Sequence, residues 1–386
     1  MDTLIVAPNR SDNSLGRALS LAEVFSELGS VRLLAGDDGP LWQGARDSGF
    51  VVDGFERLAD IVAAIRTTRP TTVVTVKPFR RSLRWTVMAV RASAQNGASP
   101  LLVVDLDDYD AAIHADWHRD LPPLERARSI ARSELSPLRI RARIHQLLPA
   151  AGMLTVSSWA LRGCLPRFSG PEVRLPHPRC ARAYEPPVPS ERLRVGFLGT
   201  PVGYKGVETV CRLVQAGDDT ELHVLAGAEE AFSAVDTERL LIHPHQGSET
   251  LMHAFRHVDV VVLPQQADVP AARYQLPAKL VDALRFGRPV VATDTPPIRE
   301  LAGPSVQLVS SWEPLDDGLR ALDALRHRER RETLGRQGSE AWAAAFSASK
   351  LADELAGALT NAGVGVATAR LRSDDDSARS STRAYP

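Results

Sequence analysis

The hydrophobic residues of the chain gather in short apolar runs separated by stretches with helical spacing. Residues 15–28 have an amphipathic helical pattern that ends at Gly29. Apolar strands that alternate with amphipathic helices are typical of a parallel sheet covered on both faces. The first half is therefore predicted to be an α/β domain with a doubly wound sheet. Its apolar runs are residues 3–7, 31–35, 50–53, 73–76, 101–104 and 154–156.

The alternation continues through the second half, with apolar runs at residues 193–198, 222–226, 240–243, 260–264 and 289–292. The clearest helix follows the fourth of these runs, because Pro277 suits a first helical turn and Gly287 suits a helix end. A helix amino terminus at the carboxyl end of a parallel strand offers free N–H groups to an anion. A phosphate is therefore expected at residues 274–279. Lys279 and Asp282 share one face of this helix.

A change in composition divides the chain near residue 186. Residues 185–190 read EPPVPS, and three prolines in six residues make a stiff segment that does not fit a strand. We therefore expect a first domain over residues 1–185, a linker over 186–192 and a second domain over 193–340. Residues 363–386 are rich in serine, arginine and aspartate, a composition typical of a disordered tail.

The overall composition excludes several functional classes. The chain has 386 residues, of which 44% are hydrophobic and 24% charged, and its formal net charge is −1. This balance lacks the basic excess that nucleic-acid binding usually needs. The three cysteines are widely spaced and odd in number, which argues against a disulfide framework and a zinc site. No apolar run reaches the ~18–20 residues of a membrane span and no signal-peptide pattern is found, so we expect a cytoplasmic protein.

Residues 282–294, DALRFGRPVVATD, resemble the EAMAxGxPVVATD segment of retaining, nucleotide-sugar-dependent glycosyltransferases with two Rossmann domains, the GT-B type. The resemblance implies two doubly wound Rossmann-like domains that face a central cleft. It also implies transfer of a sugar from a nucleoside-diphosphate donor to an acceptor with retention at the anomeric carbon, without a cofactor or a protein-bound metal. In that family the acidic residue at the position of Asp282 binds the ribose hydroxyls, and a glutamate at the position of Tyr274 contacts the sugar.

The loop at residues 199–206, GTPVGYKG, resembles the GRxxxxKG loop whose basic residues hold the donor diphosphate in these enzymes. Lys205 matches, whereas Thr200 replaces the arginine, so Arg273 or Lys279 would have to supply the second charge. We expect both Lys205 and Asp282 to face an open cleft. The resemblance implies a donor site formed by Gly199, Thr200, Lys205, Gly206, Pro244, Tyr274, Lys279, Leu280 and Asp282.

Histidines are concentrated in one stretch of the second half. His243, His245, His253 and His257 are four of the ten histidines in the chain, which makes a metal site one interpretation. Their spacing fits a metal poorly, because no HExxH glutamate lies between the last two and no cysteine is near. The resemblance instead implies that the loop containing Pro244 borders the nucleobase of the donor.

Residues 101–110, LLVVDLDDYD, place carboxylates directly after an apolar run. In the other large glycosyltransferase architecture, an aspartate pair of this kind holds a divalent cation against the donor diphosphate. The resemblance to the GT-B type implies instead that a side chain at this strand end faces the sugar across the cleft. Asp107 is the candidate for this catalytic position, together with Lys205, and Asp105 and Asp108 stay open as alternatives. Capping of a helix amino terminus is the structural alternative.

The loop after the first strand, residues 8–14, reads PNRSDNS and contains no glycine pair. The resembling family has a glycine-rich turn here that faces donor and acceptor. Asparagine tolerates left-handed backbone geometry, so Asn9 and Asn13 still allow a tight turn. Asn13, Gly16 and Arg17 are the expected approach points on the acceptor side, and a merely solvated connection is the alternative.

Residues 119–143 contain seven arginines among apolar residues and predict basic amphipathic helices. Such helices rest on anionic membranes in some proteins, but they more often present a solvated face. Acidic neighbours dilute the positive charge in this segment. Membrane contact through it therefore stays an open alternative, and we favour a small-molecule acceptor over a lipid.

Two later segments also resemble the family. Residues 296–301 resemble its GxxE segment, and Glu300 is expected to begin a helix and to support the loop. Residues 341–362 resemble its terminal helix, which crosses back to the first domain. An epimerase or hydrolase of nucleotide sugars would share this architecture, and so would a non-catalytic nucleotide-sugar-binding protein, which Thr200, Tyr274 and the missing glycines favour.

Overall fold

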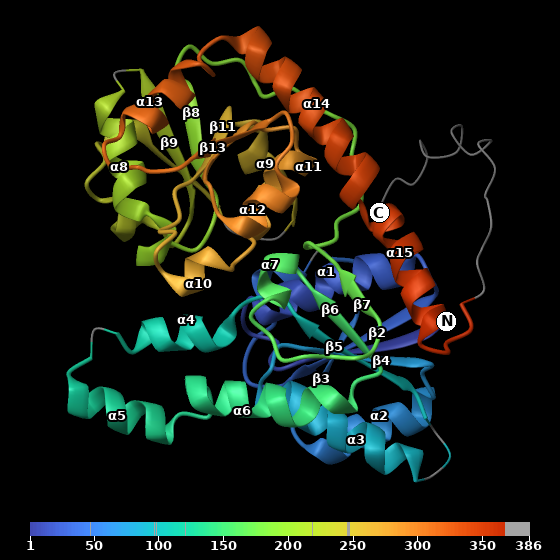
Figure 1. The fold of residues 1–386 in the computed structure, drawn as a ribbon. Helices are drawn as coiled ribbons and strands as arrows, with labels where there is room; N and C mark the ends of the chain where they lie inside the picture. The colour runs from blue at the N-terminus through green and yellow to red at the C-terminus, as the bar shows by residue number, and fades with distance from the viewer. Residues whose placement is uncertain are drawn as a thin grey trace, which may run out of the picture.

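Two parallel β-sheets make up the structure, one from each half of the chain (Figure 1). The structure is a computed structural model, and it describes residues 1–366 except for residues 47, 96, 98, 120, 218 and 245–247. Most of the predicted disordered tail, residues 367–386, lies outside the described residues. Helices cover both faces of each sheet, which confirms the predicted α/β class with two doubly wound sheets.

The first sheet has the strand order β3-β2-β1-β4-β5-β6-β7. Its strands are β1 Asp2–Ala7, β2 Ser30–Gly36, β3 Val52–Phe55, β4 Thr72–Val76, β5 Leu101–Leu106, β6 Met153–Val156 and β7 Glu172–Arg174. The helices of this half are α1 Ser14–Ser26, α2 Leu58–Thr68, α3 Trp85–Ala94, α4 Asp110–Trp117, α5 Pro123–Arg132, α6 Pro137–Leu147 and α7 Trp159–Arg162.

The second sheet has the order β10-β9-β8-β11-β12-β13. Its strands are β8 Leu193–Phe197, β9 Thr220–Leu225, β10 Leu240–His243, β11 Val260–Leu263, β12 Val290–Thr293 and β13 Val306–Val309. Its helices are α8 Val207–Ala216, α9 Ser248–Arg256, α10 Pro270–Arg273, α11 Ala278–Arg285, α12 Pro296–Leu301 and α13 Asp316–Asp323. Two long helices, α14 Arg328–Phe346 and α15 Ala348–Asn361, follow this sheet.

The strand order reverses at one point in each sheet. This point lies between β1 and β4 in the first sheet and between β8 and β11 in the second. Connections from the two neighbouring strands leave in opposite directions there, which opens a crevice at their carboxyl ends where ligands of doubly wound sheets bind. The loops after β1, β4, β8 and β11 are therefore the places to look for a site.

Burial explains why β3 lies away from its predicted position. The sequence pattern predicts a strand at residues 50–53, whereas β3 covers Val52–Phe55. Phe55 is buried in the core, and Val51 is 80% exposed. The pairing of β3 with β2 therefore begins two residues later than the apolar residues alone suggest.

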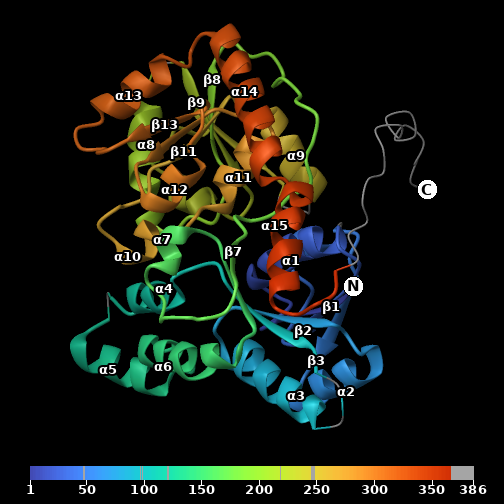
Figure 2. The same ribbon diagram turned by 45° about the vertical axis from the view of Figure 1, so that its right-hand side comes forward.

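The segment predicted as one crossing helix is two helices. They separate at Ser347, whose backbone is extended with φ −64° and ψ 155°. Helix α14 packs against α11 of the second half, and α15 packs against α1 of the first half. Figure 2 shows the pair running along one side of the molecule from the upper sheet to the lower.

The arginine-rich segment forms an arm that projects from the first half. Helices α4, α5 and α6 make up this arm, at the lower left of Figure 1. Helix α5 buries none of its side chains, and Trp117, Leu124 and Leu138 are exposed in the same segment. Within the described ranges, no helix has the length and hydrophobicity needed to cross a membrane.

Candidate active site

The loop after β8 is shaped by one glycine. Gly206 ends a short helical turn, Gly203–Lys205, with a left-handed φ of +77°. A β-carbon at this position would lie 2.0 Å from the carbonyl oxygen of Pro264, which follows β11. Only glycine fits such a close approach of two backbones. The loop is thereby pressed onto the end of β11, at the point where the strand order reverses.

Two lysines meet at this loop. The ammonium group of Lys205 donates to the carbonyl oxygen of Thr200 at 3.3 Å. Lys279, on the first turn of α11, borders Gly199, because a β-carbon there would lie 3.5 Å from its Cγ. Burial lowers the pKa of Lys205, the charge of Asp108 raises it and the charge of Lys279 lowers it again. Two positive charges therefore lie within electrostatic reach of each other, and Lys279 stands where it can replace the charge missing at Thr200.

Asp282 is enclosed by two cations. Its Oδ2 lies 3.2 Å from Nζ of Lys279, and its Oδ1 lies 3.3 Å from Nε of Arg179, which comes from the first half of the chain. Burial would raise the pKa of Asp282, but the charges of Lys279, Arg179 and Arg285 leave it below its usual value. The prediction that Asp282 faces an open cleft is therefore wrong for this structure, because the ion pair with Arg179 leaves its side chain 3% exposed. Its carboxylate is ionised all the same.

The other predicted donor residues lie at different depths. Tyr274 is half-buried, with its ring edge-on to that of Tyr109 at a centroid distance of 5.9 Å. Leu280 is fully buried in the hydrophobic core and its backbone N–H already bonds to Pro277, so neither group is free for a donor. Pro244 is exposed at the end of β10, two strands away from β8.

On the first-half side, three aspartates surround one lysine. Lys77 follows β4 with a left-handed φ of +68°, which is uncommon outside glycine and asparagine. Its Nζ lies 2.7 Å from Asp107, 2.6 Å from Asp108 and 3.3 Å from Asp110. A buried ammonium group needs such partners, since an unpaired charge in the protein interior is costly. The acidic run after β5 therefore binds a protein cation.

Asp108, and not Asp107, extends from this cluster toward the second half. The Oδ1 atom of Asp108 accepts a hydrogen bond from Nε2 of Gln275 at 3.0 Å. The carboxylate of Asp107 is buried against Lys77 within the first half. The structure thus favours the alternative in which the cleft-facing carboxylate is one position later than Asp107.

The three carboxyl groups differ in protonation. Burial raises the pKa of Asp107 to about 6 against the charge of Lys77, and it raises the pKa of Asp110 to about 8. Asp108 is the reverse case, because the charge of Lys77 and the hydrogen bonds from Lys77 and Gln275 overcome the effect of burial and lower its pKa to about 2. Asp108 is therefore the most acidic of the three and is ionised at neutral pH.

Arg17 is not free to meet an acceptor, so its predicted role needs correction. Its guanidinium group bonds to both carboxylate oxygens of Asp105, at 2.9 and 2.7 Å, and to the carbonyl oxygen of Leu175 at 2.8 Å. Thr155 donates a further hydrogen bond to Asp105 at 2.6 Å. Both charged side chains are at most 1% exposed. The ion pair of Arg17 and Asp105 joins α1 to β5, and its role is therefore structural.

The loop after β1 turns without left-handed residues, which corrects the expected use of Asn9 and Asn13. Asn13 has φ −65° and is exposed, and Asn9 is not among the described residues with positive φ. The turn is made by Asp12, which accepts hydrogen bonds from the backbone of Ser14 at 2.7 Å and from the side chain of Asn9 at 2.6 Å. Gly16 lies under the ring of Trp42. Of the predicted approach points, Asn13 is the accessible one.

Four histidine rings stack beside β9 and β10, and three of them, His243, His253 and His257, belong to the predicted set. The fourth ring is that of His223 on β9, and His245 lies outside the described residues. The Nδ1 atom of His223 is 2.8 Å from Nε2 of His243, and His253 and His257 lie against the latter ring. Burial lowers the pKa of His223 and of His243 to about 4. Among the described residues, no group of three or more histidine, cysteine, aspartate or glutamate side chains is arranged to hold a metal ion.

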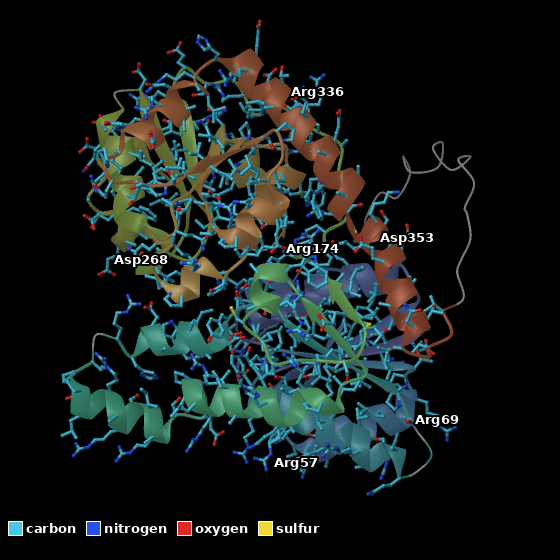
Figure 3. The ribbon with its side chains drawn as sticks, in the orientation of Figure 1. Arg57, Arg69, Arg174, Asp268, Arg336 and Asp353 are labelled. Atoms are coloured by element: carbon cyan, nitrogen blue, oxygen red, sulfur yellow. The ribbon has the colours of Figure 1, made fainter. Side chains whose placement is uncertain are left out.

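Glu300 connects the two halves. It lies near the carboxyl end of α12, which corrects its predicted place at a helix start. Its carboxylate accepts hydrogen bonds from the backbone of Trp159 at 2.9 Å and of Ala160 at 2.7 Å, and it pairs with Arg174 at 3.2 Å. Figure 3 shows Arg174 where the two halves meet. Glu300, on α12 of the second half, therefore caps the amino terminus of the short helix α7 in the first half.

Residues 192–322 match the family model described as Glycosyl transferases group 1. The second half of the chain carries a group 1 glycosyltransferase domain. The match includes the loop with Lys205 and the helix with Asp282, and it confirms the family predicted from these two segments. A search of the curated proteins gave no match.

Solved structures of similar fold extend over nearly the whole chain. Anabaena Alr3699/HepE in complex with UDP-glucose has a TM-score of 0.66 and 13% identity over 93% of this chain and 99% of that chain. Sucrose-phosphate synthase (tll1590) from Thermosynechococcus elongatus has a TM-score of 0.62 and 13% identity, over 92% of this chain and 98% of that chain. A putative UDP-N-acetylglucosamine 2-epimerase from Listeria monocytogenes has a TM-score of 0.53 and 12% identity, over 95% of this chain and 98% of that chain. At these identities the likeness shows the fold, which confirms the predicted arrangement of two Rossmann-like domains.

Sequence reasoning missed three residues that border the glycosyltransferase domain from the first half. They are Lys77, His177 and Arg179. One signal for Lys77 was present, because the chain has only four lysines and three of them, Lys77, Lys205 and Lys279, gather around Asp108 and Asp282. The other two residues lie after β7, in a segment without a matching family motif.

Proposed function

We propose that the chain transfers a sugar from a nucleoside-diphosphate donor to a small-molecule acceptor, with retention of the anomeric configuration and without a protein-bound metal. The group 1 glycosyltransferase domain supports the reaction class. The donor class is supported by the structures of Anabaena HepE, which are complexes with UDP-glucose, with UDP and glucose, and with UDP. The few, unpaired cysteines support a cytoplasmic location.

The observation that carries the proposal is the grouping of Lys205, Lys279 and Asp282 at the ends of β8 and β11. A nucleoside diphosphate needs fixed positive charge at its phosphates and a hydrogen-bond acceptor at its ribose hydroxyls. Lys279 bonds to Asp282 and borders Gly199, so one helical turn offers both kinds of group. The two lysines take the place that a divalent cation has in metal-dependent enzymes of this reaction class.

Catalysis in this proposal depends on the departing diphosphate. As the bond between the anomeric carbon and the phosphate oxygen breaks, negative charge grows on that oxygen, and a nearby ammonium group stabilises it most in the transition state. Lys205 and Lys279 are assigned this role. Asp108, which is ionised and extends toward the second half, is assigned the orientation of the sugar or the acceptor. Asp107 then has an indirect role through Lys77.

An epimerase or hydrolase of nucleotide sugars is the second candidate. The similar fold of the putative Listeria monocytogenes epimerase favours it. Such an enzyme would convert or hydrolyse the nucleotide sugar in the absence of any acceptor, whereas a transferase requires one. A non-catalytic binding protein is the third candidate, and it would bind a nucleotide sugar without turning it over.

A panel of nucleotide sugars tests the donor class. Purified protein is heated with UDP-, GDP-, ADP- and TDP-sugars, and the unfolding temperature is measured, because a ligand of the folded state raises it. We expect one nucleotide series to give the largest shift. Incubation of that sugar with and without a panel of small acceptors then separates the candidates. Nucleotide release that does not depend on an acceptor would support the hydrolase, and the absence of any shift would contradict the proposal.

Two further measurements test the retention of anomeric configuration and the independence from a metal. Proton NMR of the product at early times reports the anomeric configuration, and inversion would contradict the retaining mechanism. Turnover in EDTA tests metal independence, with MnCl₂ added back as the control. We expect unchanged turnover in EDTA because the carboxylates of Asp107, Asp108 and Asp110 are bound to Lys77. Loss of turnover that Mn²⁺ restores would overturn that part.

A further inference from the structure

The segment at residues 176–179 reads Pro-His-Pro-Arg and leads from β7 toward the second half. His177 in this segment has a left-handed φ of +47°, and its side chain is buried. Left-handed geometry is unfavourable for a residue with a β-carbon, and it persists only where surrounding contacts hold it. The segment is therefore fixed by its contacts and is not a loose connection.

One of these contacts fixes the start of α11. The Nε2 atom of His177 lies 3.0 Å from the carbonyl oxygen of Leu276, two residues before this helix. Burial lowers the pKa of His177 to about 3, so its ring is neutral at physiological pH. Since a carbonyl oxygen only accepts hydrogen bonds, the ring proton must be on Nε2.

Arg179 makes the second contact and joins three parts of the molecule. Its Nε lies 3.3 Å from Oδ1 of Asp282 on α11, and its Nη1 donates to Oγ of Ser20 on α1 and, at 3.0 Å, to the carbonyl oxygen of Pro178. Its own carbonyl oxygen accepts from the backbone of Ala348 at 2.8 Å, where α14 ends and α15 begins. The first sheet, the donor helix and the terminal helices therefore meet at one residue.

The carboxylate of Asp282 keeps hydrogen-bonding capacity beside its two cations. Lys279 contacts one oxygen and Arg179 the other. A carboxylate has about four lone-pair positions, so two remain as acceptors for the hydroxyl groups of a ribose. A ribose needs an ionised carboxylate held in one orientation. One of the two cations that hold Asp282 in this way, Arg179, comes from the first half of the chain.

We propose that Arg179 is a positioning residue of the donor site: it orients Asp282 from the first half and makes ribose binding depend on the closed arrangement of the two sheets. This inference rests on the proposed function, which assigns Asp282 to the donor. Arg179 acts through Asp282 and through its links to α1 and α15. Its loss therefore weakens donor binding and loosens α11, while the chemistry on the diphosphate continues.

The first test needs no donor. Hydrogen exchange of the α11 amides is measured for the wild type, Arg179→Ala and the control Arg256→Ala, whose guanidinium group forms an exposed ion pair with Glu185. We expect exchange at α11 to be about tenfold faster in Arg179→Ala and unchanged in the control, in proteins with the same circular dichroism. Arg179→Lys is the second variant if the alanine variant does not fold. Unchanged exchange at α11 in Arg179→Ala, or in Arg179→Lys if the alanine variant does not fold, would overturn the inference.

The second test uses UDP-glucose as the probe, followed by isothermal titration between pH 4 and 8. We expect the dissociation constant of Arg179→Ala to be about tenfold higher at pH 7, and its binding to weaken at a higher pH than in the wild type, because the carboxylate loses one cation. KM for the donor should rise while kcat changes less than about twofold. Arg179→Lys should restore the pH profile.

The outcomes separate the inference from the proposed function. A wild type that binds none of the nucleotide sugars contradicts the proposed function, and the exchange experiment still decides whether Arg179 holds α11. Normal donor binding and an unchanged pH profile in Arg179→Ala would contradict the inference and leave the proposed function intact. An equal fall of kcat in Arg179→Ala and Arg179→Lys would also contradict it, because a positioning role through charge is kept by lysine.

Discussion

Lys279 and Asp282 lie one helical turn apart on α11, with Nζ of the lysine 3.2 Å from Oδ2 of the aspartate. Each group changes what the other is able to do. The ammonium group keeps the buried carboxylate ionised, and the carboxylate gives the charge of Lys279 a partner in the folded protein. A phosphate-binding charge and a ribose-binding acceptor are therefore stable side by side before a donor arrives.

Asp282→Asn should destabilise the protein as well as weaken donor binding. The amide keeps the shape of the side chain, but it leaves Lys279 and Arg179 facing a neutral group in a site that is 3% exposed on the aspartate side. Loss of a charged hydrogen bond of this kind costs roughly 1.5–3 kcal/mol. We expect a lower free energy of unfolding in urea and a dissociation constant for the donor raised at least about tenfold. Asp323→Asn on α13, whose carboxylate is exposed, is the control and should change neither quantity.

Gly206→Ala should distort the loop after β8. The left-handed φ of +77° costs roughly 1–2 kcal/mol for a residue with a β-carbon, and the new carbon would lie 2.0 Å from the carbonyl oxygen of Pro264. Calorimetry should show a lower unfolding temperature together with weaker donor binding. Gly203→Ala in the same loop has open space around its β-carbon and serves as the matched control. Equal unfolding temperatures for the two variants would contradict the role given to Gly206.

Most strands were predictable because local patterns encode them, whereas β7 and β13 were not predicted. Strand β10 agrees with the predicted apolar run residue for residue, since such runs are local signals. The family motif likewise lies within a few consecutive residues of the second half. The donor loop and its helix could therefore be located from sequence alone.

Contacts between the halves could not be predicted in this way. Arg179 and Asp282 are 103 positions apart, and Gln275 and Asp108 are 167 positions apart. No local pattern records which of three neighbouring aspartates also bonds to the second half, because that contact depends on how the two halves pack. The roles of Arg17 and Leu280 changed for a related reason, since burial is a property of the folded chain.

The histidine stack should make the protein less stable in mild acid. Burial lowers the pKa of His223 and of His243 to about 4 from the ordinary value of 6.5, so the unfolded chain binds protons first as the pH falls. Their contribution to stability is therefore complete above pH 6.5 and declines between pH 6.5 and about 4.

Urea denaturation between pH 7 and 4.5 measures this effect. His223→Phe keeps a ring in the stack but cannot titrate, so we expect its midpoint to change less with pH than that of the wild type. The raised pKa values of Asp107 and Asp110 act in the opposite direction, and they are common to both proteins. The difference between the two curves isolates the histidines, and parallel curves would contradict their low pKa values.

The last prediction separates the two lysines of the donor site. In the part of the chain that the structure describes, the side chain of Lys205 makes one hydrogen bond, to the carbonyl oxygen of Thr200, so Lys205→Ala should leave the unfolding temperature unchanged. Its charge stabilises the departing diphosphate, and kcat should fall roughly 10²- to 10³-fold. Lys279→Ala also removes a partner of buried Asp282, so it should lower the unfolding temperature and donor affinity as well as kcat. Lys350→Ala, an exposed lysine on α15, is the matched control. Wild-type kcat and donor KM in a folded Lys205→Ala protein would show that the loop after β8 binds no phosphate.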